Sequence, residues 1–306
     1  MQRFIVVRLF QNIIALIILS MIIFFLVRLS GDPALLMLPE GATQEHYQEM
    51  RTQLGLDKPI YVQYGIFLAN AARGDFGRSI RTKRVVIASI KEALPNSMKL
   101  VVVSMVMAIL ISIPLGVMAA VKKGAFIDTF ARVVAGLGQS LPTFWVGLML
   151  IQLFVVWLGI LPASGMETWK HYLMPAFCLA IYLVAGIVRL LRSSMLDALD
   201  SEYIKMARIK GVSERVIIYK HALRNSILPI LSFGGMYVAI MITGAILIET
   251  VFAWPGIGRL AYRAIVSQDF PLIQGVVMAA AVVVMTANLI TDILYSFFDP
   301  RIRHQV

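Results

Sequence analysis

The chain has 306 residues, of which 59% are hydrophobic and 15% charged, with a mean hydropathy of +0.81. Soluble domains carry about 45–50% apolar and about 25% charged residues, so this composition excludes an ordinary soluble protein and predicts one embedded in a bilayer. The net charge of +11 would suggest nucleic acid in a soluble chain. Here the basic residues gather at the ends of apolar segments, so we expect no nucleic-acid partner and use them to predict topology.

Six apolar stretches are long enough to cross about 30 Å of hydrocarbon as helices. They are Leu9–Leu29, Ser97–Val121, Val133–Leu158, Leu173–Leu191, Ile230–Phe252 and Leu272–Phe298. The sequence therefore predicts an all-α membrane protein, a polytopic bundle of six transmembrane helices. The first stretch has no small-residue cleavage pattern and is followed by Gly31-Asp32-Pro33, so we expect it to be retained. Pro114 and Pro142, inside spans, are expected to kink helices or to mark close packing.

Lysines and arginines in the short loops predict the orientation. Most of them precede the first span, separate the second from the third, crowd the loop between the fourth and fifth, or follow the last: Arg3, Arg8, Lys122, Lys123, Arg132, Arg189, Arg192, Lys205, Arg208, Lys210, Arg215, Lys220, Arg224, Arg301 and Arg303. The short loops of the other side carry only Lys170, Arg259 and Arg263. We therefore expect both termini and the loop between the fourth and fifth spans to be cytoplasmic.

Residues 30–96, between the first two spans, form a long segment that we expect on the external side. Helical patterns occur at Glu45–Leu54 and Ile60–Ala72, but the segment has too few apolar residues to bury a core of its own. We expect a small external cap. The predicted parts are residues 1–29 with the first span, the external segment 30–96, the core 97–298 with the loop 200–229, and the tail 299–306.

The loop Asp200–Pro229 has the pattern of a helix, a glycine turn and a second helix. Ser201 is expected to cap the helix Glu202–Lys210, and Gly211 to end it in the left-handed conformation. Ser213 with Glu214 is expected to start the second helix. A short charged helical hairpin held between membrane spans predicts a docking site.

Polar residues inside the spans are candidates for a passage through the membrane. Gln139, Ser140 and Thr143 either line such a passage or form hydrogen bonds across helices. Asn288 and Asp292 are four residues apart and share one helix face. Asp292 either meets a transported solute or lies near the cytoplasmic end and pairs with a basic neighbour.

A turn and a short helix follow the fifth span. Glu249 ends that span, and Trp254-Pro255-Gly256 is expected to turn the chain at the outer surface, with the indole in the interfacial belt. A re-entrant helix at Ile257–Val266 would either close an external gate or form a capped turn. Arg259 and Arg263 are expected to present charge on one face of it.

The sequence offers no catalytic or metal-binding constellation. Cys178 lies inside an apolar stretch, and the four histidines are scattered at or outside span ends without ligand spacing. These positions argue against an intramembrane enzyme, which needs a nucleophile and its base together. No Gly-x-x-x-x-Gly-Lys-Ser/Thr loop is present, so we expect no nucleotide or other cofactor on this chain.

The loop and several other segments resemble the permeases of ATP-binding-cassette importers, in the branch for dipeptides, oligopeptides, glutathione and nickel. The loop residues that carry the resemblance are Tyr203, Ala207, Arg208, Lys210, Gly211, His221-Ala222-Leu223-Arg224-Asn225 and Leu228-Pro229. Matching motifs elsewhere are Gly31-Asp32-Pro33-Ala34, Leu54-Gly55-Leu56-Asp57, Gly74-Asp75-Phe76-Gly77, Trp254-Pro255-Gly256 and Asp299-Pro300-Arg301-Ile302-Arg303. Where other importers have Glu-Ala-Ala, this chain has Lys205, Met206 and Ala207, although the glycine turn is kept.

The resemblance implies a bacterial inner-membrane permease subunit without catalytic activity. Its partners would be a second homologous permease, two cytosolic subunits that bind ATP and Mg²⁺, and an external substrate-binding protein. The expected contact surface for the ATPase is Glu202, Tyr203, Ala207, Arg208, Gly211 and Arg215. Alternatively, the hairpin is a basic surface attracted to anionic headgroups.

The expected cargo is a peptide, with a nickel complex as the alternative. A self-contained secondary transporter is a further possibility, but it needs coupling-ion or proton groups at mid-membrane, and apart from Asp292 the sequence offers no such group there.

Overall fold

The computed structural model describes residues 2–38, 43–53, 55–232 and 234–298. Throughout these ranges the regular elements are helices, and the motif Asp299-Pro300-Arg301-Ile302-Arg303 and the predicted C-terminal tail lie outside them. The chain divides into two compact units. One combines residues 1–96 with 256–285, and the other combines residues 97–255 with 286–306.

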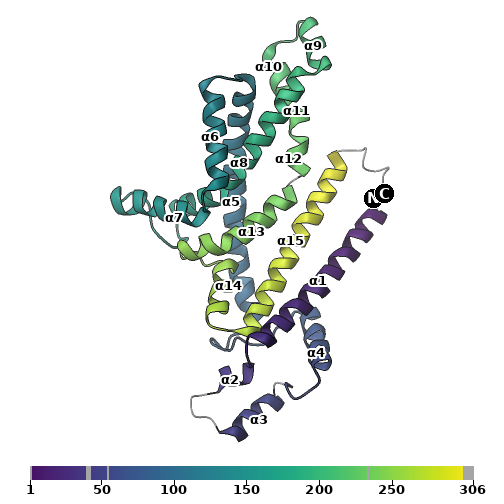
Figure 1. Cartoon of the computed structure of the whole chain (residues 1–306), viewed down its shortest axis with the longest axis vertical. Helices are drawn as coiled ribbons and strands as arrows, with labels where there is room; N and C mark the ends of the chain where they lie inside the picture. The colour runs from purple at the N-terminus through teal and green to yellow at the C-terminus, as the bar shows by residue number, and fades with distance from the viewer. Residues whose placement is uncertain (1, 39–42, 54, 233, 299–306) are drawn as a thin grey trace. The chain divides into compact units, whose positions relative to one another are not determined.

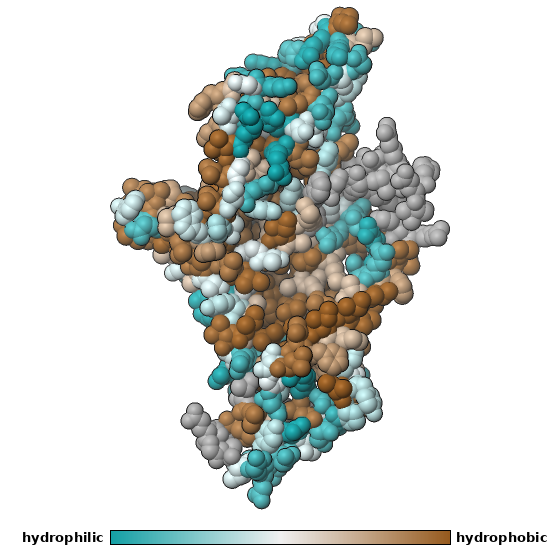
Figure 2. Space-filling view, in the orientation of Figure 1, coloured by the Kyte–Doolittle hydropathy of each residue, from teal (hydrophilic) through white to brown (hydrophobic). Residues whose placement is uncertain are grey.

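Within the described residues, four helices are long and apolar enough to cross a membrane. They are α1 (Gln2–Ser30), α5 (Val86–Val121), α8 (Lys170–Asp200) and α15 (Phe270–Phe298), drawn in Figure 1. Two bent helix pairs meet the same criteria, which gives up to six spans. Large apolar side chains along α1, including Phe10 at 63% exposure, lie open on its surface, where Figure 2 is brown. This pattern suits contact with lipid and confirms an all-α polytopic membrane protein.

The third predicted span, Val133–Leu158, is not one straight helix. It consists of α6 (Phe126–Ser140), α7 (Thr143–Ile151) and the π-helical turn η1 (Gln152–Trp157), with a bend of 104° after Ser140. Leu141 is extended, with ψ of 132°, because the following Pro142 disfavours the helical region for the residue before it. By contrast, α5 continues through Pro114.

The second span starts earlier than the apolar pattern predicts. Helix α5 begins at Val86 instead of Ser97. The apolar pattern missed its first turns because they carry polar residues such as Lys91 and Glu92. Val86 and Ile90 nevertheless face inward and are buried, together with Ala93. This polar beginning is therefore a packed part of the first unit.

Short helices complete the first unit. They are α2 (Pro33–Met37), α3 (Gln44–Gln53), α4 (Ile60–Ala72) and α14 (Ile257–Val266). The last three correspond to the helices predicted at Glu45–Leu54, Ile60–Ala72 and Ile257–Val266, whereas α2 was not predicted. The carboxylate of Asp32 caps α2 by accepting from the Ala34 N–H, and it accepts from the Tyr47 hydroxyl of α3. Helix α4 lies against α1, where Tyr64 approaches the hydroxyl of Ser20 at 2.9 Å.

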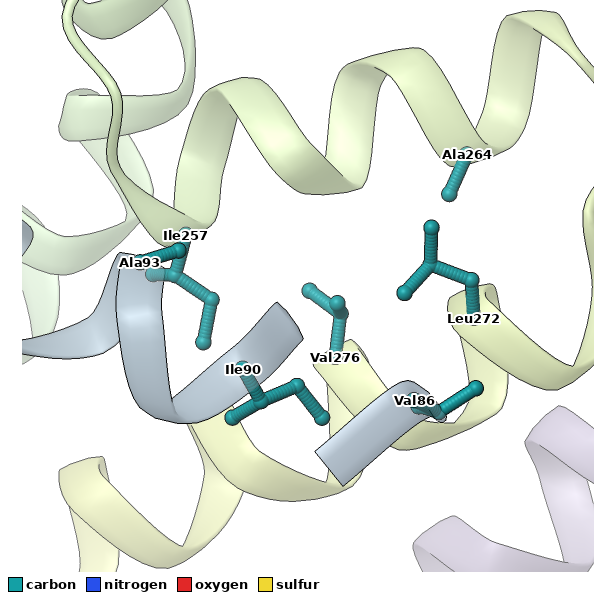
Figure 3. Close-up of a cluster of buried hydrophobic side chains, with 7 residues drawn as sticks. All are labelled: Val86, Ile90, Ala93, Ile257, Ala264, Leu272 and Val276. Carbon is teal, nitrogen blue, oxygen red and sulfur yellow. The ribbon is translucent and has the colours of Figure 1, made fainter. Parts of the chain in front are cut away.

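A buried apolar cluster joins α5, α14 and α15. Figure 3 shows its side chains pointing toward one another from the three helices: Val86, Ile90, Ala93, Ile257, Ala264, Leu272 and Val276. The Asp269 carboxylate, 1% exposed, lies between α14 and α15. It accepts from the Ser79 hydroxyl and the Ile80 N–H, so the loop before α5 is fixed to this cluster.

The second unit centres on α6, α8 and α13 (Gly234–Val251). Helix α6 approaches α8 closely at Gly138, where a Cβ atom would lie only 2.8 Å from the carbonyl oxygen of Ile181. A buried carboxylate, Asp128, accepts from Arg192 of α8 at 2.5 and 3.0 Å. Small residues and one buried ion pair thus hold these two helices together.

Candidate functional site

The loop between α8 and α13 is the predicted helical hairpin. Its first helix is α9 (Glu202–Ile209), and its second arm consists of α10 (Glu214–Val216), η2 (Ile217–Ala222), α11 (Leu223–Ser226) and α12 (Leu228–Ser232). Gly211 adopts φ of +76°, as predicted for the turn. Ser201 and Ser213 occupy the N-cap positions, but neither side chain accepts the capping hydrogen bond. The Ser201 hydroxyl instead donates to the carbonyl of Ala198 at 2.5 Å, which corrects the predicted side-chain cap.

The hairpin is anchored to the membrane helices by a buried cluster. Ile204 from α9 and Ile217 from η2 are fully buried. They lie in one cluster with Leu191 of α8 and Val117 of α5, near the ends of both spans. Ala207, predicted for the contact surface, is half-buried against this cluster. Because the anchor is apolar and close-packed, the hairpin cannot shift without moving against α5 and α8.

Polar contacts connect the two arms across the turn. Arg208 Nε donates to Glu214 at 2.8 Å, and this hydrogen bond raises the pKa of the Arg208 guanidinium above its ordinary value. Asn225 of α11 donates to the Tyr203 hydroxyl at 3.0 Å. Within α9, Glu202 also pairs with Lys205 at 2.8 Å. These groups are exposed, so each pair contributes about 0–1 kcal/mol and mainly fixes orientation.

The outward face of the hairpin carries large apolar side chains. Tyr203 is 44% exposed, Met206 56% and Ile209 79%. They recur every three residues and therefore form one stripe along α9. In Figure 2 the hairpin, at the top of the view, is mainly hydrophilic, with a few hydrophobic side chains at its tip. The sequence prediction omitted Met206 and Ile209, although their exposure beside Arg208 and Arg215 makes them part of the same accessible surface.

The predicted passage residues of the third span lie at the bend between α6 and α7. Gln139 and Ser140 are exposed, and Thr143 is half-buried. The Ser140 hydroxyl donates to the Gly136 carbonyl at 2.9 Å, a bond within its own helix. In α15, Asn288 is exposed and Asp292 half-buried. Their roles in a passage stay predictions.

The end of the fifth span is more enclosed than the sequence suggests. Glu249 is fully buried and accepts a hydrogen bond from the Ser97 hydroxyl at 2.5 Å. Trp254 is also fully buried, with its ring edge-on to Tyr172 at 4.6 Å. The start of α8 therefore covers this turn, and the place of the indole in the interfacial belt stays a prediction. Arg259 of α14 is half-buried and Arg263 exposed.

Comparison with known proteins covers the whole chain. Residues 112–304 match the model of the family described as binding-protein-dependent transport system inner membrane component, and residues 1–104 match the model of its N-terminal part. The glutathione transport system permease protein GsiC of Escherichia coli strain K12 is 36% identical over the full length of both chains. The oligopeptide transport system permease protein AppB of Bacillus subtilis strain 168 is 37% identical over 99% of this chain and all of that protein. The chain therefore belongs to the family of binding-protein-dependent inner-membrane transport components and is a multi-pass membrane permease.

Proposed function

We propose that this chain is one membrane subunit of an ATP-driven importer and forms half of a translocation pathway for peptides. Membership in the family implies, in general, a substrate-binding protein and an ATPase as partners, and such permeases are generally non-catalytic. The proposed assembly contains a second homologous permease, two cytosolic subunits that hold ATP and Mg²⁺, and an external binding protein. Both termini and residues 200–229 lie in the cytoplasm, with residues 30–96 outside.

The anchoring of the hairpin carries this proposal. An ATPase that moves α9 also moves Ile204, whose buried contacts with the cluster around Leu191 and Val117 pass the displacement to α8 and α5. A solvated polar loop would absorb such a displacement instead. Closure of the ATPases can therefore shift the spans between outward-open and inward-open arrangements, as alternating access requires.

The exposed stripe of α9 gives the ATPase something to bind. Tyr203, Met206 and Ile209 offer apolar area, with Arg208 and Arg215 beside them for acidic groups on the partner. Aromatic and arginine side chains are common anchors of protein interfaces. A hairpin that only attracted lipid headgroups would depend on the arginines and lysines alone.

We expect Ile209→Glu to weaken binding of the ATPase without unfolding the chain. The side chain is 79% exposed, so the change buries no charge in the free subunit, whereas the bound state would have to desolvate the carboxylate. A central interface residue contributes about 2 kcal/mol or more, which corresponds to roughly 30-fold weaker association. The measurement is the amount of ATPase that co-purifies with the chain, and Thr82→Glu, in an exposed loop of the first unit, is the control. Equal recovery from both variants would contradict docking through α9.

The cargo is the second point to test. GsiC and AppB are named for glutathione and oligopeptides, which supports a peptide-like solute and does not favour nickel. In cells with the complete importer, we expect uptake of labelled glutathione or short peptides to compete with unlabelled peptide but not with nickel salts. An ATPase unable to hydrolyse ATP should stop this uptake. Uptake that persists and follows the proton gradient would support a secondary transporter instead.

A further inference from the structure

A hollow of about 390 Å³ lies between α6 and α8, and apart from Gln139, a predicted passage residue, its lining plays no role in the function proposed above. Three arginines line it, Arg132 from α6 and Arg189 and Arg192 from α8, together with Gln139 and the small residues Ala135 and Gly136. Pockets of about 300–1,000 Å³ are typical of small-molecule sites, so a glycerophosphate group fits this volume.

The hollow exists because α6 presents small residues at this level. A Cβ atom added to Gly136 would meet no atom within 4 Å, whereas one added to Gly138 would press on the backbone of α8. The helices are thus held close at Gly138 while the space beside Gly136 stays open. Ala135 and Val188 supply apolar walls next to the arginines.

The hollow is positively charged and partly pre-organised. Asp128 neutralises one guanidinium, because Arg192 donates to it at 2.5 and 3.0 Å and Arg132 Nε lies 3.7 Å away. The Asp128 carboxylate also accepts from the Gly124 N–H at 2.9 Å, so it holds Arg192 from a fixed position. One carboxylate among three arginines leaves positive charge in excess. Arg189 is exposed and makes no ion pair within the described ranges.

The charged end of the hollow is near one expected membrane surface. Asp128 and Arg132 lie in the first two turns of α6, and Lys122 and Lys123 lie in the turn between α5 and α6. The positive-inside pattern assigns this end to the cytoplasmic leaflet. Basic pockets between membrane helices on that side suit anionic headgroups, and the planar guanidinium fork matches phosphate oxygens.

We propose that this hollow binds the phosphate of an anionic phospholipid from the cytoplasmic leaflet. Arg132 and Arg189 contact the phosphate oxygens, while Arg192 stays paired with Asp128 and holds α8 in place. The glycerol and the first acyl carbons lie along Ala135 and Val188. A lipid bound there would link α6 to α8, the helix that leads into the hairpin.

Native mass spectrometry on the full chain in its complex tests this site, with phosphatidylglycerol and phosphatidylcholine as probes. We expect the wild type to retain phosphatidylglycerol preferentially. Replacing both Arg132 and Arg189 with glutamine should weaken that retention by about 30-fold, from about 1 kcal/mol for each basic residue. Gly136→Leu should also lower retention by filling the hollow, and its charge is unchanged.

The controls separate this site from general attraction to charge. Lys122→Gln with Lys123→Gln removes two charges outside the hollow and should leave retention of phosphatidylglycerol unchanged. Equal loss in this control, or equal retention of phosphatidylcholine, would overturn the proposal. Inorganic phosphate or glutathione bound as tightly as the lipid would assign the hollow to a free anion and would also overturn it.

Discussion

Replacing Gly211 with proline is expected to lower coupled uptake strongly while the chain still inserts into the membrane and its ATPase still hydrolyses ATP. Gly211 has φ of +76°, and a proline ring fixes φ near −65°. The change also removes the N–H that donates to the Arg208 carbonyl at 3.0 Å. Lys210 has ψ of 3°, a conformation that a following proline disfavours. The turn therefore has to open, and α9 loses its fixed angle to the second arm.

The expected effect lies in transmission of movement, because Gly211 itself is exposed and a Cβ atom added to it would meet no atom within 4 Å. Coupling free energies between sites are typically about 1–3 kcal/mol, so uptake should fall by about 5–150-fold at similar ATPase activity. Both rates are measured on the reconstituted complex. Gly211→Asn is the conservative control, since asparagine tolerates the left-handed region. Ser213→Pro places the same ring two residues along, where φ is −63° and suits it. Normal uptake by Gly211→Pro would contradict the lever mechanism.

The hairpin was largely predictable from sequence because its signals are local. A serine before Glu202 and a glycine after Lys210 bracket α9 to within one residue of its observed end. The long apolar helices follow from composition in the same way, and both ends of α14 are as predicted. Which face of α9 is buried was not predictable in full, because the burial of Ile204 depends on Leu191 and Val117, which are distant in the sequence.

Long-range packing accounts for what the sequence did not predict. A tryptophan in a turn after a span is typical of the membrane surface, and the sequence did not predict that Trp254 is fully buried against Tyr172 of α8. The 104° bend at Pro142 differs in having a local cause, and this proline was expected from sequence to kink a helix or to mark close packing. The role of Asp269 was missed as well. The local pattern, Asp269 followed by Phe270 and Pro271, is typical of a helix start but does not predict the bonds to the loop before α5.

Replacing Asp269 with alanine is expected to destabilise the first unit strongly. The carboxylate accepts from the Ser79 hydroxyl, from the Ile80 N–H at 3.1 Å and from the Arg81 N–H at 3.4 Å. It also accepts from the Leu272 N–H at 3.4 Å, in the first turn of α15. Alanine leaves these donors without an acceptor in a site where Ser79 and Ile80 are buried. Each buried donor left unpaired costs about 1–3 kcal/mol, so we expect a total loss of roughly 3 kcal/mol or more.

Thermal unfolding of the purified chain measures this loss. A change of that size corresponds to a melting temperature lower by roughly 5–10 °C for a chain of this class. Asp269→Asn keeps the shape but turns one acceptor into a donor, so an intermediate decrease is expected. Asp75→Ala is the matched control, because Asp75 accepts one N–H, from Gly77 at 2.9 Å, at an exposed turn of the same unit. Its removal should cost less than about 1 kcal/mol. Equal melting temperatures for the two alanine variants would contradict the claim that the buried hydrogen bonds of Asp269 fix the loop before α5 to the start of α15.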